Sequence, residues 1–315
     1  MRPSRLPVVA WVVACAGSAG PAASSTPGTA RTPPAADTPG PRDSGSDALG
    51  AACGSLESLD ALTCVVAEGL RQGLPGMDVS WEPGTVSLSR PEGATARVSL
   101  DNLLVAMAHA GSEEAALGVL ESFVASTVEA VAAGDRSIDP AEVRAVLKPL
   151  AWLRALPPDA PAPQTRPFGG ELVVVYVRDL PRSLRLLGPG DLQELGLDGA
   201  GLDALARANL RAAFPGAPRL VPFAGLGAPL LRVDAEDGYA AARMLLPGRF
   251  AALAREAGGL HAAVPTRDLM LLARDDEAAA REALRVEAEQ RFARGAYPVS
   301  PRVWRWTEAG FVPAD

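Results

Sequence analysis

The chain has few of the residues on which common catalytic and metal sites depend: two histidines, three cysteines and one lysine, Lys148. His109 falls in an Ala-rich predicted helix and His261 begins an apolar predicted strand, so no zinc-protease or His-rich metal pattern is present. Because Leu147 precedes Lys148, a Walker-type phosphate loop is excluded. No Gly-x-Ser-x-Gly motif marks a serine hydrolase. We therefore expect no metal and no cofactor.

Positive charge is also scarce. The chain carries 30 Lys and Arg against 37 Asp and Glu, a formal net charge of −7. Affinity for nucleic acid comes mainly from clustered cations that neutralise phosphates, so a nucleic acid is not expected as a partner. After residue 15 no run of about 20 continuous apolar residues occurs, and no later segment is expected to span a membrane.

The first fifteen residues have the pattern of a bacterial lipoprotein export signal. Arg2 and Arg5 precede the apolar run 6–14, which ends in Val-Val-Ala, and Cys15 follows at once. A basic start, an apolar stretch of roughly 7–15 residues and small residues before a cleavage point describe a secretory signal, and the cysteine is where a lipid would be attached. Two alternatives stay open: an ordinary signal cut among residues 16–23, and a cytosolic chain with an apolar start.

We predict that residues 1–15 are a lipoprotein signal peptide and that Cys15 is lipidated. The predicted location is the cell envelope, at the outer membrane or facing the periplasm if the bacterium is Gram-negative. The lipid anchor would make the membrane a partner. Residues 16–50 are rich in Pro, Ala, Ser, Thr and Gly and contain few large apolar residues. Such a composition predicts a disordered linker, which would hold the folded part roughly 30 Å from the membrane.

The Pro-rich segment 156–167 is interpreted as a connection between two lobes. It would separate an N-terminal α/β lobe, residues 51–155, from a C-terminal α+β lobe, residues 168–315. The strongest strand signal is Leu172–Val177, a nearly continuous β-branched run typical of a strand buried on both faces.

Apolar spacing and turn residues outline the remaining elements. They predict an α+β fold: two-lobed, with a mixed β-sheet and flanking helices. Trp304 and Trp306 alternate on the last strand, which is expected at a sheet edge. Their shared face is either core or a contact surface for a partner, and we favour the core. The predicted helices are 56–74, 101–133 with a break at 111–112, 191–195, 202–213, 239–246, 249–257 and 275–294, and the other predicted strands are 77–82, 85–89, 96–100, 219–223, 229–233, 260–264, 269–273 and 302–306.

Cys53 and Cys64 form either one disulfide or two buried thiols, and the sequence leaves both open. If residues 53–64 were one helix, the two Cα atoms would lie about 16 Å apart, well beyond the roughly 7 Å that a disulfide allows. A bridge therefore requires the helix to begin late, near Ser58 or Asp60, with Cys53 folded back over it.

The second half of the chain contains four short motifs: 206–210 (ARANL), 237–241 (DGYAA), 263–268 (AVPTRD) and 297–300 (YPVS). In these motifs, and in their order and spacing, the chain resembles the YtpQ-like family, a group classed as a domain of unknown function. The likeness extends, more weakly at first, from about residue 60 to the end. It implies no activity, cofactor or catalytic set. Typical members begin directly with the folded domain, so a cytosolic role of relatives does not carry over to a chain with a leader and a linker.

The polar residues of these motifs are the candidate ligand-binding site: Asn209, Asp237, Tyr239, Arg267 and Asp268. They would converge if the turns that hold them lie at one edge of a sheet. Arg267 would keep Asp268 ionised and could bind an anion. Each residue also has a structural explanation, since Asp-Gly turns, hairpin turns and loop-supporting amides need these side chains, and we favour that explanation.

Two classes of function follow. The first is a non-catalytic binding or interaction module of the cell envelope, with a protein or small-molecule partner. The second is an enzyme of unrecognised type that uses Asp237, Arg267 and Asp268. We favour the first because no nucleophile with a neighbouring base can be named, and whether the chain is an enzyme stays open.

Overall fold

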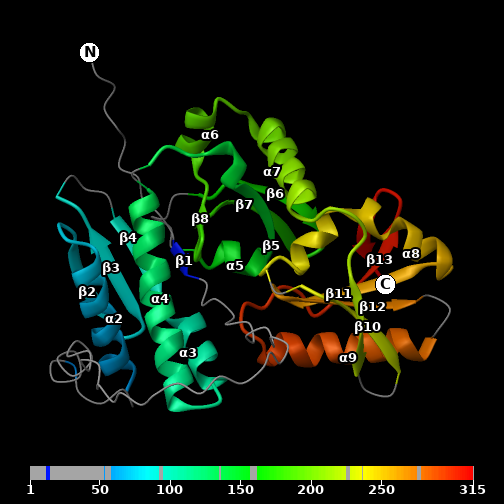
Figure 1. Ribbon diagram of the computed structural model, residues 1–315, viewed down its shortest axis with the longest axis horizontal. Helices are drawn as coiled ribbons and strands as arrows, with labels where there is room; N and C mark the ends of the chain where they lie inside the picture. The colour runs from blue at the N-terminus through cyan, green and yellow to red at the C-terminus, as the bar shows by residue number, and fades with distance from the viewer. Residues whose placement is uncertain are drawn as a thin grey trace, which may run out of the picture.

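The computed structural model describes most of the chain from residue 58 to residue 314 (Figure 1). Most of the expected leader, with the candidate lipidation residue Cys15, and the whole expected linker 16–50 lie outside the described residues. The described residues are 12–14, 53, 58–91, 95–134, 136–156, 162–224, 228–235, 237–274 and 278–314.

Helices and three β-sheets confirm the α+β class. The helices are α2 (Leu59–Gly73), α3 (Asp101–Ala108), α4 (Glu113–Ala133), α5 (Leu150–Arg154), α6 (Pro189–Leu195), α7 (Gly199–Ala213), α8 (Ala251–Glu256) and α9 (Ala278–Arg294), with 3-10 helices η1 (Pro140–Glu142), η2 (Ala241–Leu245) and η3 (Pro247–Phe250). The strands are β1 (Val12–Ala14), β2 (Asp78–Glu82), β3 (Thr85–Ser89), β4 (Thr95–Ser99), β5 (Val143–Pro149), β6 (Thr165–Gly169), β7 (Leu172–Asp179), β8 (Ser183–Leu186), β9 (Leu220–Ala224), β10 (Pro229–Val233), β11 (Leu260–Thr266), β12 (Leu269–Arg274), β13 (Val303–Thr307) and β14 (Gly310–Pro313).

All pairings between these described strands are antiparallel, which corrects the expected mixed sheet. Short turns explain the difference. Several neighbouring strands, such as β2 with β3 and β11 with β12, follow one another after two residues, whereas parallel pairing needs a crossover of a dozen residues or more.

The N-terminal sheet has the order β2-β3-β4 and is covered by α2. Val86 and Leu88 of β3 are buried in the core that this sheet shares with α2 and α4. Helix α2 begins at Leu59, and the Ser58 side chain caps it by accepting the backbone N–H of Ala61. The helix thus starts where the disulfide geometry required.

Cys53 and Cys64 are joined by a disulfide, with Cα atoms 5.6 Å apart. Because α2 begins only after Cys53, this residue can lie beside the second turn of the helix instead of three turns below it. The bridge attaches Cys53 to the helix itself. Of the two alternatives for these cysteines, the structure contains the disulfide.

The central sheet is built on β7, whose residues are all buried except Asp179. Its order is β1-β8-β7-β5, and β6 pairs with the first half of β7. Strand β5 pairs with β7 along its whole length, although the two lie on opposite sides of the Pro-rich connection 156–167. The main division between hydrophobic cores falls earlier, between Ala133 and Ile138. Two paired strands of one sheet thus lie on either side of this connection in the sequence.

Strand β1 lies at the outer edge of the central sheet. Its residues pair antiparallel with β8: Val12 with Arg185, Val13 with Leu184 and Ala14 with Ser183. It also contacts α4 and β4. Three residues of the expected leader thus occupy a sheet edge, a position that composition alone did not predict.

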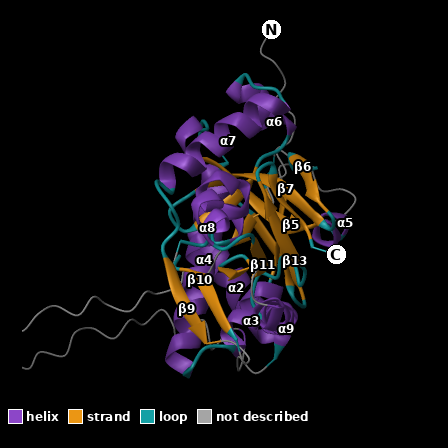
Figure 2. Cartoon of the chain, turned by 90° about the vertical axis from the view of Figure 1, so that its right-hand side faces the viewer, coloured by secondary structure: helices purple, strands orange, loops and turns teal. Residues whose placement is uncertain are grey.

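The C-terminal sheet has the order β14-β13-β11-β12-β10-β9, and α9 packs against β10, β11 and β12 (Figures 1 and 2). Trp304 on β13 is fully buried and Trp306 packs against the same core, as expected. The expected edge position of this strand is wrong, because β14 pairs with its outer side. Strand β14 was missed because it is only four residues long and contains a glycine and a proline.

Helix α4 is, in the part of the chain that the structure describes, the one helix long and apolar enough to cross a membrane. It packs against α2, α3 and β8, between the N-terminal and central sheets (Figure 1). Its buried residues, which include Phe123 and Ala130, belong to the N-terminal core. About a third of its most apolar window is buried within the fold.

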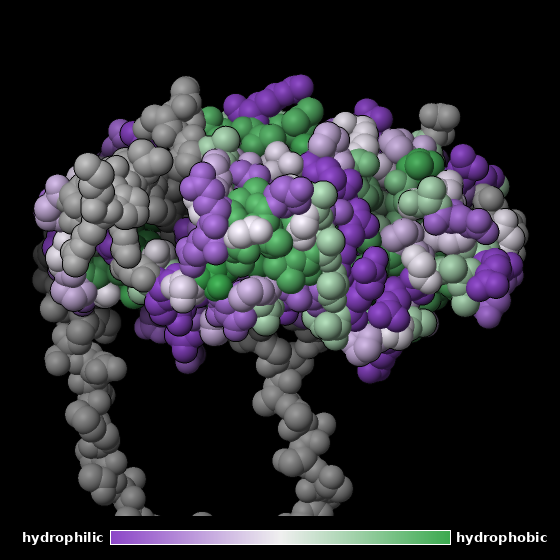
Figure 3. All heavy atoms as spheres, turned by 90° about the horizontal axis from the view of Figure 1, so that it is seen from above, coloured by the Kyte–Doolittle hydropathy of each residue, from purple (hydrophilic) through white to green (hydrophobic). Residues whose placement is uncertain are grey.

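On the face seen from above, polar and apolar residues are mixed, with an apolar area near the middle (Figure 3). Among the described residues the large apolar side chains classed as exposed are mostly N-terminal. They are Leu59, Trp81, Leu104, Leu117 and Val312.

Candidate functional site

An Asp-Gly turn forms the centre of the candidate site. Gly238 has φ of +76°, a left-handed conformation that glycine adopts without strain. The Asp237 carboxylate accepts the backbone N–H of Tyr239 at 2.9 Å, which closes the turn. The sequence folds this way because the Asp237 side chain accepts the Tyr239 N–H in place of a backbone carbonyl, and because Gly238 can adopt the left-handed conformation of the turn.

Asp237 is also held by an arginine from the next helix. Nη1 and Nη2 of Arg243 donate to its two carboxylate oxygens at 3.0 and 2.6 Å, and the guanidinium lies 4.0 Å from the ring centre of Phe214. Burial by itself would raise the pKa of Asp237, but the hydrogen bonds from Arg243 and from the Tyr239 backbone outweigh it and lower the pKa. The carboxylate stays ionised and both of its oxygens are engaged.

Arg267 and Asp268 occupy the hairpin turn between β11 and β12. Nε of Arg267 donates to Oδ1 of Asp268 at 2.8 Å, Nη2 donates to Oδ2 at 3.1 Å, and the guanidinium stacks on the Tyr297 ring at 4.0 Å. A Cβ atom on Gly238 would lie 3.6 Å from Asp268 Oδ1 and 3.7 Å from Arg267 Nε. The two turns are therefore in contact.

Asp179, at the end of β7, joins these residues and was not predicted from the sequence. Burial raises its pKa, and the nearby Tyr239 hydroxyl and the positive charge of Arg144 oppose this rise. Nε of Arg144 lies 3.7 Å from Asp179 Oδ2. A single acidic residue at the end of a strand belongs to no motif, and the one available signal was its place two residues after the strongest predicted strand, Leu172–Val177. We call Asp179, Asp237, Tyr239, Arg267 and Asp268 the Asp237 cluster.

Asn209, the fifth predicted residue, has a different role. Its Nδ2 donates to the carbonyl oxygens of Pro140 at 2.7 Å and Val143 at 2.9 Å. These bonds attach α7 to the start of β5 instead of joining the Asp237 cluster. The structure thus brings four of the five predicted residues together and assigns the amide of Asn209 to backbone support.

A second polar cluster lies on α7 around Asp203. Its carboxylate accepts Tyr176 Oη at 2.8 Å, Arg166 Nε at 3.1 Å and Arg207 Nε at 2.8 Å. Burial would raise the pKa of Asp203, but these partners lower it overall, whereas burial and the Asp203 hydrogen bond raise the pKa of Tyr176 to about 12. The cluster fixes α7 to the central sheet.

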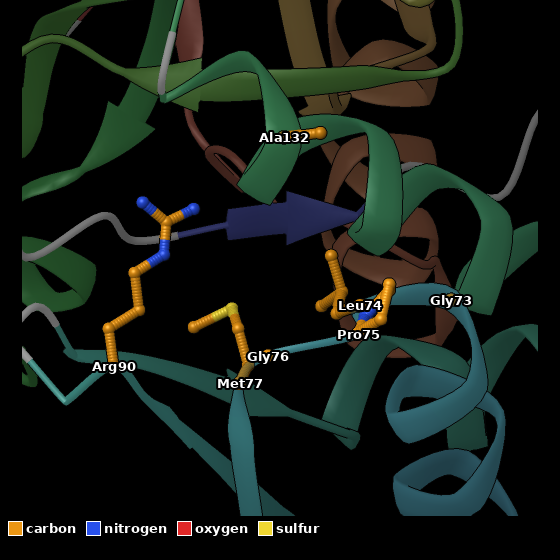
Figure 4. Close-up of a pocket in the computed structure, with 7 residues that line it drawn as sticks. All are labelled: Gly73, Leu74, Pro75, Gly76, Met77, Arg90 and Ala132. Carbon is orange, nitrogen blue, oxygen red and sulfur yellow. The ribbon is translucent and has the colours of Figure 1, made fainter.

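A cavity of about 330 Å³ lies at another place, in the N-terminal part. It is lined by the turn after α2 and by Ala132 of α4, with Arg90 on the opposite side (Figure 4). Its lining residues are Gly73, Leu74, Pro75, Gly76, Met77, Arg90 and Ala132. The cavity includes no residue of the Asp237 cluster. No group of three metal-binding side chains occurs in the described ranges.

Comparisons with other proteins add no assignment. No family model matches the chain, and neither the curated proteins nor the solved structures contain a match. The resemblance to the YtpQ-like family therefore stays a prediction.

Proposed function

We propose that this chain is an exported, lipid-anchored protein of the bacterial cell envelope whose folded part is a non-catalytic binding module. The observation that carries the proposal is the leader: two arginines, the apolar run 6–14 and Cys15 directly after Val-Val-Ala. The Cys53–Cys64 bridge supports it, because disulfides persist in oxidising compartments and are rare in the cytosol.

The place of β1 is compatible with removal of the leader. Cleavage before Cys15 would take β1 away, and β1 contributes three residue pairs at one edge of the central sheet. The pairings of β5, β6 and β8 with β7 do not involve β1. The sheet would therefore keep four strands in the mature chain.

The hydrogen bonds of the Asp237 cluster favour binding or structure over catalysis. Asp237 closes a turn and accepts both Nη atoms of Arg243, and Arg267 holds Asp268. A general base or nucleophile needs an oxygen or nitrogen available to the reactant. The carboxylates of Asp237 and Asp268 already accept hydrogen bonds from partners within the fold.

Metabolic labelling with an alkyne-tagged palmitate tests the lipid anchor. The parent chain should take up the label and fractionate with membranes, whereas Cys15→Ser should be unlabelled and should leave the membrane fraction on mild washing. Equal partitioning of the two chains, with the initiating methionine retained in the parent, would refute the proposal.

An enzyme remains a second candidate because of one observation. Asp179 and Asp237 belong to one cluster, and their pKa values move in opposite directions, a pattern seen where one carboxyl acts as an acid and another stays ionised. Asp237→Asn and Arg267→Ala distinguish the candidates. A lower melting temperature in both variants supports a structural role, whereas variants that melt like the parent but have lost function support a site.

A further inference from the structure

The outer edge of β8 holds a strand that the mature protein would lack. Strand β8 is four residues long and all four are buried. One side pairs with β7 and the other with β1. Because β1 also contacts α4 and β4, it lies in a slot between the edge of the central sheet, helix α4 and the edge strand of the N-terminal sheet. We call this the β8 slot.

We propose that in the mature protein the β8 slot binds an extended, mainly apolar segment of a partner protein as an added antiparallel strand. The proposal rests on the proposed function, since cleavage before Cys15 is what removes β1. An edge strand without a neighbour exposes a row of N–H and C=O groups, and strand addition satisfies them. Residues 12–14 already show that an extended Val-Val-Ala segment fits this edge.

Arg185 indicates that the partner segment carries a hydrogen-bond acceptor. Its side chain is 4% exposed, and Nη2 donates to Asp191 Oδ1 at 2.9 Å. Nε and Nη1 are buried and have no hydrogen-bond acceptor among the described residues. Arg185 is the register partner of Val12, and opposite residues in an antiparallel pair have Cβ atoms about 5 Å apart. An acidic residue at the position of Val12 would therefore give the guanidinium the acceptor that it lacks.

A second copy of the chain suits the slot less well. Pairing of two β8 strands across a two-fold axis would place two Arg185 side chains opposite each other, each already paired with its own Asp191, and would give neither guanidinium the acceptor that its Nε and Nη1 lack. Arg178, the neighbour of Arg185 on β7, cannot relieve this because it is a further cation, bound to Glu142. A separate segment that carries a carboxylate is the complementary occupant.

Fluorescence anisotropy tests the proposal with the unlipidated mature chain, residues 16–315, and labelled peptides of residues 5–14. The parent peptide should bind. A Val13→Pro peptide, which lacks one ladder N–H, should bind at least about tenfold more weakly. A Val12→Glu peptide should bind the parent protein about tenfold more tightly than the parent peptide does, and Arg185→Met in the protein should remove this difference between the two peptides.

The full-length Cys15→Ser chain is the matched control, because its own β1 fills the slot and should weaken peptide binding at least about tenfold. Circular dichroism and a melting curve verify that the mature chain folds. Failure to fold, no binding, equal binding of the proline peptide, or dimerisation of the mature chain through β8 would each overturn the proposal. The assay uses purified protein, so a negative result is distinct from failure of lipidation at Cys15.

Discussion

Arg178 is expected to be the most important single polar side chain for stability. It lies on β7 and is 2% exposed. Nε donates to Glu142 Oε2 at 2.5 Å, Nη1 to the carbonyl oxygens of Ala133 and Arg136 at 2.9 and 3.1 Å, and Nη2 to that of Ser137 at 3.0 Å. One guanidinium thus joins the end of α4 to the central sheet.

Replacing Arg178 with alanine removes all four hydrogen bonds and leaves the buried carbonyl oxygen of Ala133 without this partner. Breaking a buried charged pair costs about 3–5 kcal/mol. Because the Glu142 side chain is 29% exposed and water can reach it, we expect the lower end, about 3 kcal/mol. Arg178→Lys keeps the charge but not the planar fork, and should still lose about 2 kcal/mol.

Urea unfolding of the mature chain, followed by circular dichroism, measures both changes. Arg285→Ala is the control: this arginine on α9 is 49% exposed and pairs with Glu282 and Glu289, and surface pairs of this kind contribute little. Its unfolding curve should overlay that of the parent. If Arg178→Ala unfolded at the same urea concentration as Arg285→Ala, the reasoning on Arg178 would be refuted.

Three further predictions can be checked in the same way. Replacing Cys53 and Cys64 together with serine should lower the free energy of unfolding by about 3 kcal/mol without reductant, because the bridge closes a loop of about a dozen residues; no change in urea midpoint would contradict this. Burial alone would raise the pKa of Asp237, but its hydrogen bonds lower it, so its stabilising effect is complete above the unfolded-state pKa of about 3.9 and is lost as pH falls through the folded-state value. The free energy of unfolding of Asp237→Asn should therefore fall less steeply at acid pH than that of the parent. An equal fall in the two proteins would count against the lowered pKa of Asp237. In Gly295→Ala the new Cβ would lie 2.6 Å from a backbone carbonyl oxygen, whereas at Gly248 nothing lies within 4 Å, so only the first variant should lose about 2 kcal/mol or more of stability; equal melting temperatures would show that the site relaxes.

The elements with strong local patterns could be predicted from the sequence. The run 172–177 is β-branched except for Leu172 and Tyr176 and forms the buried part of β7, and the break at 111–112 does divide α3 from α4. Strand β5 was missed because Arg144, Lys148 and Pro149 interrupt its apolar residues. Most residues of β5 are buried where it pairs with β7, and the sequence of β5 alone does not indicate this burial.

For the candidate site, too, only residues with a local sequence pattern could be predicted. Asp237, Tyr239, Arg267 and Asp268 could be named because their turns have local signatures. Asp179 joins them only through the packing of β7 against the Asp-Gly turn, and no spacing along the chain records that contact.

Mass spectrometry of the N-terminus of the protein purified from its own membranes tests the central claim most directly. The account predicts that the chain begins at Cys15 and that this residue carries the added mass of a diacylglyceryl group. A chain that begins at Met1 with unmodified Cys15 would contradict the account, and would make β1 a permanent strand of the fold.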